Sequence, residues 1–301
     1  MTDVRTDTVP VRPAGRPARR YRGGRAGAVA LVLSALLSQE LGAASAVQLF
    51  PRVGAPGVAS LRLAISAALL LAVARPRIRG RSRADWALIG AYGVTTATMN
   101  MLFYQAIARI PLGAAVTLEV LGPLALSVAT GRRVINGLWA ALALAGVALL
   151  GRAGMHGLNL AGAAFALGSA VMWAGYILLA ARAGRRFARI DGLALAMAIG
   201  GMVSLPLGAA SAGLAIISPG VLLAAGLVAV LSAALPYTLE LLSLRRLSAP
   251  AFATLMSLGP AIAAAAGYFV LHQALTAAGG LAITLVIVAS AGAVRTSPPR
   301  V

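Results

Sequence analysis

Four charged side chains fall inside long apolar stretches of this 301-residue sequence: Glu40, Arg62, Glu119 and Glu240. Within a membrane such a group costs roughly 2.5–3.5 kcal/mol or more unless it is paired or faces water, so it is by default a candidate for function. A helix rises about 1.5 Å per residue. Measured from the extracellular end of each stretch, Glu40 lies roughly 15 Å, Arg62 roughly 13 Å and Glu119 roughly 10 Å deep on this rise. Their similar depth predicts a cluster of three charges.

This cluster has two interpretations. An ion pair between Arg62 and a carboxylate lowers the cost of both charges and serves only the fold. Alternatively, Glu119 and Arg62 bind the charged groups of a solute, and a second carboxylate carries a coupling proton. For Glu119 the two interpretations weigh about equally, whereas Glu40 beside Gln39 favours function. Glu240, five residues before Arg245, is interpreted as an interfacial side chain that reaches toward the lipid headgroups.

Polar and aromatic residues in other apolar stretches are candidates for the wall of a cavity that takes a small amphipathic solute. Trp173 and Tyr176 are three residues apart and share a helix face. The other candidates are Asn100, Phe103, Tyr104 and Tyr237, each of which can also be a packing residue. His156 and His272 have no second histidine or carboxylate at metal-ligand spacing, so the sequence indicates no metal site and no cofactor.

The elements that position these residues are apolar helices. With 60% hydrophobic residues, 11% charged residues and a mean hydropathy of +0.89, the chain is excluded from the class of ordinary soluble domains. The absence of cysteine excludes thiol chemistry. A spanning helix needs about 20 mainly apolar residues. We predict an all-α membrane protein with ten spans: Ala26–Phe50, Val53–Ala74, Trp86–Ala108, Leu112–Thr130, Val134–Leu150, Leu158–Ala181, Gly192–Ala212, Val221–Leu244, Ala249–His272 and Leu275–Val294.

The distribution of arginine predicts the orientation of these spans. If the N-terminus is cytoplasmic, 22 arginines lie on the cytoplasmic side, against Arg52, Arg109 and Arg152 outside and Arg62 within a span. Because short cytoplasmic loops collect positive charge, both termini are predicted to be cytoplasmic, at 1–25 and 295–301. The net charge of +19 is thereby explained without nucleic acid, since the arginines are spread over loops.

The first 25 residues are rich in arginine, proline and glycine and are predicted to be a disordered tail. A cleavable signal peptide is the alternative, because small residues at 42–46 follow the basic segment and an apolar run. The apolar run continues past those residues, which favours the tail.

An internal repeat at an offset of 137 residues relates the fourth span to the ninth. Six residues match at this offset: Arg109, Thr117, Leu118, Leu121, Gly122 and Pro123 correspond to Arg246, Thr254, Leu255, Leu258, Gly259 and Pro260. The repeat unit therefore has five helices, at 26–150 and 158–294. An odd number of spans gives the two halves opposite orientations, a design that places a binding site near the midplane. The Gly122–Pro123 and Gly259–Pro260 pairs break the helical ladder and are candidate hinges, a packing kink being the alternative.

Several strings of residues, in order along the chain, resemble a known family. They include Leu49-Phe50-Pro51, Leu102-Phe103-Tyr104, Leu118-Glu119, Gly122-Pro123-Leu124, Trp173-Ala174, Leu235-Pro236-Tyr237 and Thr254-Leu255-Met256-Ser257. Together they resemble the drug/metabolite transporter superfamily, in its ten-helix EamA branch and the threonine/homoserine exporter type. The resemblance implies two inverted five-helix halves around a central cavity, lined by spans 1, 3, 4, 6, 8 and 9. The pattern departs from the family at Gly259 and Gln273, where glutamate is common, and at Glu40, where glutamine is common.

These observations favour an exporter of small amino acids in a bacterial-type cytoplasmic membrane, operating by alternating access. An exporter of drugs or other metabolites on the same fold is the alternative, because a fold does not fix a substrate. A membrane enzyme lacks a visible catalytic constellation, and a non-transporting scaffold would not need three charges at one depth. The expected partners are a small-molecule substrate and lipid. The oligomeric state stays open, and a monomer is compatible with the sequence.

Overall fold

The computed structural model describes residues 25–130, 134–153, 159–187, 190–244 and 255–296, and within these ranges the chain is helical without strands. The first half contains α1 (Arg25–Val47), α2 (Phe50–Ala74), α3 (Arg83–Ile107), α4 (Leu112–Glu119), α5 (Leu121–Thr130) and α6 (Val134–Ala153). The second half contains α7 (Leu160–Arg186), α8 (Asp191–Ala212), the 3₁₀-helix η1 (Gly213–Ile217), α9 (Pro219–Ala229), the π-helix η2 (Val230–Ala234), α10 (Leu235–Leu244), α12 (Gly259–Leu271) and α13 (Ala277–Thr296).

Helices occupy the apolar stretches that the sequence singles out, but three of those stretches are not single α-helices. The stretch at 112–130 is interrupted at Val120, between α4 and α5. The stretch at 221–244 contains the π-helical turn η2. In the stretch at 249–272, the helix α12 begins only at Gly259, and residues 249–254 lie outside the described ranges. The sequence predicts breaks at Gly122–Pro123 and Gly259–Pro260, but it makes no such prediction for the irregular turn before Pro236. Each of these three prolines lacks the N–H that a continuous ladder needs.

Within the described ranges, five helices are by length and composition able to cross a bilayer: Ala26–Val47, Phe50–Ala74, Leu160–Arg186, Asp191–Ile217 and Ala277–Thr296. Shorter apolar helices lie at Leu112–Leu126, Gly137–Leu149, Pro219–Ala234 and Gly259–Leu271. The chain is therefore a membrane protein that is helical throughout its described elements, as the composition predicts. Residues 1–24 of the predicted tail, the last five residues and His156 lie outside the described ranges, whereas Arg25 begins α1.

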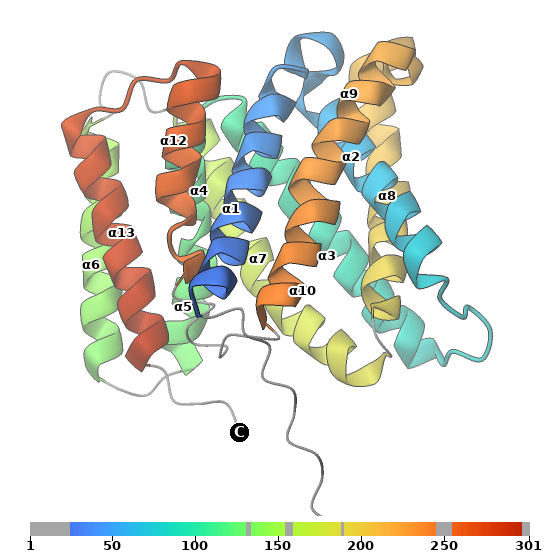
Figure 1. Cartoon of the computed structure of the whole chain (residues 1–301), viewed down its shortest axis with the longest axis horizontal. Coiled ribbons are helices and arrows are strands. Elements are labelled where there is room, and N and C mark those ends of the chain that lie inside the picture. The colour runs from blue at the N-terminus through green and yellow to red at the C-terminus, as the bar shows by residue number, and fades with distance from the viewer. Residues whose placement is uncertain (1–24, 131–133, 154–158, 188–189, 245–254, 297–301) are drawn as a thin grey trace, which may run out of the picture.

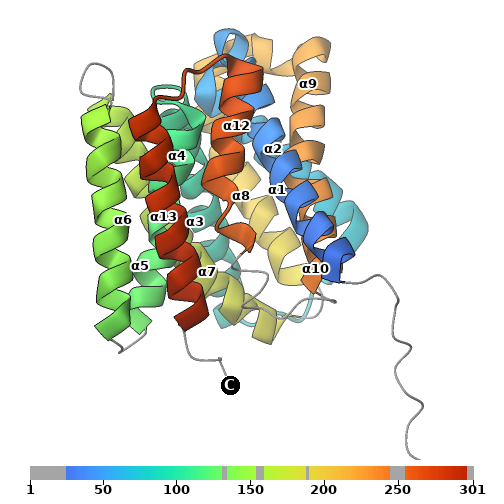
Figure 2. The same ribbon diagram turned by 60° about the vertical axis from the view of Figure 1, so that its left-hand side comes forward.

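The helices form one bundle in which distant segments pack side by side. The pairs α2 with α8, α6 with α13, α3 with α7, and α1 with α10 make extensive contacts. Figures 1 and 2 both show α6 and α13 adjacent at one edge. The beginning of α1 and the end of α13 lie at the same end of the bundle (Figure 1), which we call the terminal end.

The largest apolar core lies at the other end of the bundle. It joins the end of α1 to the beginning of α2, the end of α3 to the beginning of α4, and η1 to α9. Leu49, Val53, Ile107, Leu112 and Val221 are among its buried side chains. This end is closed by packed apolar side chains.

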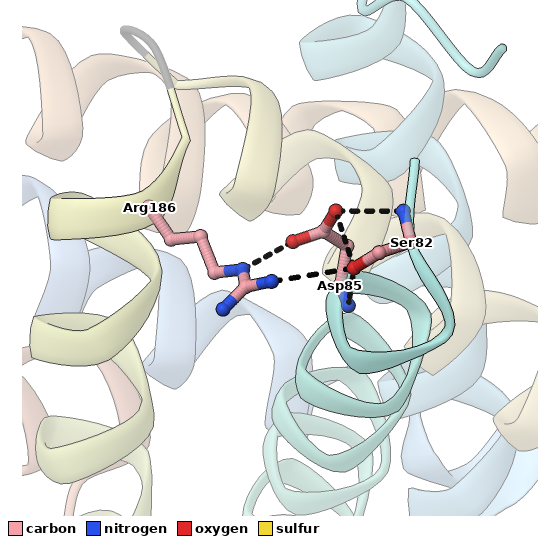
Figure 3. A network of polar contacts seen from close by, with 3 residues as sticks. All are labelled: Ser82, Asp85 and Arg186. Carbon is pink, nitrogen blue, oxygen red and sulfur yellow. Dashed lines mark hydrogen bonds and ion pairs between the residues drawn. The ribbon is translucent and has the colours of Figure 1, made fainter. Parts of the chain in front are cut away.

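At the terminal end, an ionic network ties α3 to α7 (Figure 3). Ser82 caps α3: its Oγ accepts from the N–H of Asp85 at 3.1 Å, and the Asp85 carboxylate accepts from the N–H of Ser82 at 2.8 Å. Arg186 at the end of α7 donates to the Asp85 carboxylate, and its Nη2 donates to Ser82 Oγ at 3.2 Å. The hydrogen bond from Arg186, with that from the Ser82 backbone, lowers the pKa of Asp85 from 3.8 to about 2.

This network predicts a pH dependence of stability. Because the pKa of Asp85 is lower in the folded chain, its charge stabilises the fold fully above about pH 4, and this contribution is lost as the pH falls toward about 2. The thermal midpoint of unfolding in detergent should therefore be lower for Asp85→Asn than for the wild type at pH 7, and the difference should vanish near pH 2. A difference that stays constant over this range would contradict the ionic origin.

Candidate functional site

A cavity of about 380 Å³ lies in the middle of the bundle and extends toward the terminal end. Its wall reaches Ile177 in the second half of α7, Val294 near the end of α13 and Met197 in the first turns of α8. Seven of the eight predicted binding or coupling residues line it: Glu40, Arg62, Asn100, Tyr104, Glu119, Trp173 and Tyr176. The eighth, Tyr237, lies on α10, and its side chain is outside the described part of the structure.

Arg62 of α2 is fixed by three hydrogen bonds. Its Nε donates to Ser232 Oγ at 2.6 Å, its Nη2 donates to the Ser232 carbonyl at 3.0 Å, and its Nη1 donates to Asn100 Oδ1. Its guanidinium carbon also lies 5.8 Å from the centre of the Tyr104 ring. The guanidinium thus connects α2, α3 and η2 at the cavity wall.

The acceptors on η2 are explained by Pro236. In an α-helix the Ser232 carbonyl would accept from the N–H of residue 236, but proline has none. The ladder shifts to the π pattern, in which the N–H of Leu235 donates to the Val230 carbonyl. The carbonyl of Ser232 then accepts from Arg62, and that of Leu231 accepts from Ser38 Oγ of α1 at 2.6 Å.

Glu119 is the last residue of α4 and stands at the helix interruption before α5. Its Oε1 accepts from Ser169 Oγ of α7 at 2.5 Å, and the Ser169 hydroxyl also lies 3.0 Å from the Met99 carbonyl of α3. Glu119 is partly exposed and lines the cavity. Its carboxylate is therefore anchored on one side and accessible on the other.

Glu40 of α1 is only 3% exposed, and its Oε2 has no hydrogen-bond partner among the described residues. The expected ion pair of Arg62 with a carboxylate is not formed: the ion pairs between described residues are Arg81–Asp191 and Arg186–Asp85. Arg62 is bound by neutral acceptors instead, because Ser232 and Asn100 saturate the guanidinium edge that faces them. One cation and two carboxylates thus share a cavity without pairing to one another.

Aromatic rings form part of the cavity wall. Trp173 and Tyr176 both line it, as expected for two residues on one face of α7. The Tyr176 ring packs at 5.2 Å from that of Tyr92, and the Tyr104 ring packs at 5.9 Å from that of Phe103. These contacts give the charges an apolar surround. The side chain of Glu240, interpreted above as interfacial, lies outside the described part of the structure.

The two Gly-Pro pairs lie at helix beginnings rather than inside continuous helices. Gly122 and Pro123 are in the first turn of α5, and Gly259 and Pro260 begin α12. Pro123, Gly259 and Pro260 line the cavity. Gly122 instead packs against α7, where a Cβ would overlap the carbonyl oxygen of Ala170. A hinge role for these four residues stays a prediction.

The close approach at Gly122 predicts a large effect of a single methyl group. Gly122→Ala should force α5 and α7 apart and destabilise the protein by about 1–3 kcal/mol, the usual cost of overpacking. The matched control is Gly226→Ala in α9, where a Cβ meets no atom within 4 Å. Thermal unfolding in detergent should show a lower midpoint for the first variant only; equal midpoints would contradict the packing role.

Two residues of the site have no clear signal in the sequence. Ser169 and Ser232 are ordinary serines in apolar stretches, yet they bind the side chains of Glu119 and Arg62. For Ser232 a signal exists in retrospect: it lies four residues before Pro236, where the helix loses a donor. No comparable signal marks Ser169.

Apolar helices around a cavity that holds charged side chains fit a membrane transporter, and the comparisons with known proteins show that class. Residues 160–295 match the EamA-like transporter family. The chain is 41% identical over 271 residues to the threonine/homoserine exporter RhtA of Salmonella typhimurium strain LT2, which covers 89% of this chain and 91% of that protein. It is 40% identical over 272 residues to the threonine/homoserine exporter RhtA of Escherichia coli K12, with the same coverage.

The chain therefore belongs to the EamA-like transporter family, which confirms the resemblance read from its residues and the prediction of a transporter rather than an enzyme. A solved crystal structure that is 19% identical aligns with 91% of this chain and 98% of its own length, with a TM-score of 0.59. At that identity the likeness concerns the fold alone.

Proposed function

We propose that the chain is an exporter of small amino acids of the threonine and homoserine kind, built from ten spans in two inverted halves. The first support is the offset of 137 residues. Applied to the first-half helices, it carries α1 onto α7, α2 onto α8, α3 onto the α9–η2–α10 segment, and α5 onto α12. α6 corresponds to α13 with a small shift. A repeat derived from six residues thus predicts where the second-half helices lie.

The pattern of helix packing is the second support. If the halves are related by symmetry, each contact between two helices should recur between their counterparts. The contact of α3 with α7 recurs as that of α10 with α1, and the contact of α3 with α8 recurs as that of α9 with α2. The contacts α2–α8 and α6–α13 join a helix to its own counterpart. Such a pattern is expected for two halves related by a pseudo-two-fold axis in the membrane plane.

The orientation follows from charge and packing together. The arginine-rich connection between α2 and α3, the arginines at the end of α7, the beginning of α1 and the end of α13 lie at the terminal end (Figure 1). This end is therefore assigned to the cytoplasm by the positive-inside rule. The cavity extends toward that end, and the largest apolar core closes the other. This arrangement suits a carrier in the cytoplasmic membrane that is poised to take up a solute from inside the cell.

The proposal for the substrate rests on the unpaired charges of Arg62 and Glu119. A zwitterionic amino acid brings a carboxylate for Arg62 and an ammonium group for Glu119, both of which remain partly exposed to the cavity. Each charge of the solute compensates a charge that the fold leaves unpaired. The relatives are named threonine/homoserine exporters, which supports the same class of substrate. An exporter of other metabolites is the second candidate, since the aromatic wall also suits larger amphipathic solutes.

Export should depend on both charges of the site. In cells without their own exporters and preloaded with threonine or homoserine, the wild type should raise efflux, and Glu119→Gln and Arg62→Leu should each lower it at least tenfold, about 1.4 kcal/mol or more. Arg109→Leu, a change outside the cavity, is the matched control and should retain efflux. Normal efflux from well-expressed Glu119→Gln and Arg62→Leu variants would show that the site is wrong; no efflux from the wild type would favour another metabolite.

Proton coupling is proposed for Glu40. An ionised carboxylate that is buried without a partner is strongly disfavoured, so the neutral, proton-carrying form fits this conformation. Arg62 of α2 and Glu119 of α4 are the charged groups that share the cavity with it. Opening to the other side would expose Glu40 to water and allow the proton to exchange, which couples export to proton entry.

This assignment predicts that Glu40→Gln uncouples export from protons. Glutamine mimics the neutral carboxyl group in shape, so the fold should be retained. Efflux of threonine by the wild type should be faster at external pH 6 than at pH 8, and the variant should show no such difference. Asp191→Asn, which changes a carboxylate outside the cavity, should behave as the wild type does. A wild type without pH dependence would indicate facilitated efflux.

A further inference from the structure

The π-helical turn η2 lies where the strongest contacts of Arg62 converge. Ser232 offers two acceptors to one edge of the guanidinium, its hydroxyl to Nε and its carbonyl to Nη2. The hydroxyl itself donates to the Val228 carbonyl at 2.6 Å, so its lone pairs point toward Arg62. Asn100 holds Nη1 from the other side and is fixed in turn by donating to the Thr96 carbonyl at 2.8 Å.

We propose that η2 and Asn100 form a cradle that orients the Arg62 guanidinium so that its remaining N–H groups bind the carboxylate of the transported solute. A guanidinium has five N–H groups, and three of them have acceptors among the described residues. One N–H remains on each of Nη1 and Nη2. Two such groups form a planar fork that matches the two oxygens of a carboxylate.

The cradle makes the site selective for carboxylates because it prevents the guanidinium from reorienting. An arginine on a flexible side chain loses conformational entropy when it binds, whereas a side chain held at three points has lost it already. Ser232 and Asn100 are therefore positioning residues: they act on the solute through Arg62. Pro236 is part of the same device, since its missing N–H frees the Ser232 carbonyl for Arg62.

The inference rests on the proposed function, and a binding experiment separates the two. The purified full-length chain in detergent is titrated by calorimetry with threonine, with 3-hydroxybutyrate, which lacks the amino group, and with threoninol, which lacks the carboxylate. Ser232→Ala removes the acceptor of Nε, and Pro236→Ala restores the helical donor to the Ser232 carbonyl. Ser38→Ala is the matched control, because it removes the hydrogen bond to the neighbouring freed carbonyl of Leu231 without touching Arg62.

Ser232→Ala and Pro236→Ala should each weaken the binding of threonine and 3-hydroxybutyrate about tenfold and leave that of threoninol unchanged, while Ser38→Ala changes none of them. If the two variants bind threonine as the wild type does, or lose threonine and threoninol equally, the cradle is wrong although the chain binds amino acids. If the wild type binds 3-hydroxybutyrate but not threonine, and Ser232→Ala weakens that binding, the cradle is supported and the proposed export of amino acids is contradicted. If neither carboxylate binds, both are wrong. Should Pro236→Ala fail to fold, Ser232→Ala decides alone.

Discussion

A positive charge inside a bilayer must be held by hydrogen bonds that the protein supplies, because lipid offers none. In this chain that requirement centres on Arg62, and it is met by neutral acceptors from α3 and η2 rather than by a carboxylate. The consequence reaches the whole cavity. Since Arg62 does not neutralise Glu40 or Glu119, both carboxylates remain available, one buried and one accessible. Unpaired charges are expected in a cavity that binds a charged solute, whereas charges that serve only the fold are expected to form a salt bridge with each other.

The helices follow the proposed two-half symmetry, but the charged side chains of the cavity do not. The helices of the two halves correspond at one offset, and their contacts are exchanged in pairs, yet Glu40, Arg62 and Glu119 all come from the first half. The second half contributes Ser169, Ser232 and the aromatic pair on α7. In the proposed exchange of orientation between the two halves, such an asymmetric lining would let the solute keep one set of charged contacts.

Much of the fold, and the charged and aromatic part of the cavity wall, could be predicted from the sequence for physical reasons. Long apolar stretches are strong signals, so the helices fall where expected. The common depth of Glu40, Arg62 and Glu119 follows from residue counting along a regular helix. The partner of Arg62 could not be predicted, because it depends on a π-turn whose acceptors appear only when the backbone of 230–236 is placed against α2. The role of Ser169 could not be predicted for the same reason, because it depends on the packing of α7 against Glu119.

The prolines show how a local rule of the backbone becomes a site. Each one removes a hydrogen-bond donor, and each lies where the cavity needs irregular backbone: Pro123 after Glu119, Pro260 at the beginning of α12, and Pro236 after η2. Irregular backbone in a membrane is tolerated where protein groups or a cavity satisfy it. At Pro236 the satisfied carbonyl is the one that binds Arg62, so the defect and the binding residue stabilise each other. A change at Pro236 is therefore expected to alter the position of the guanidinium as directly as a change at one of its hydrogen-bond acceptors.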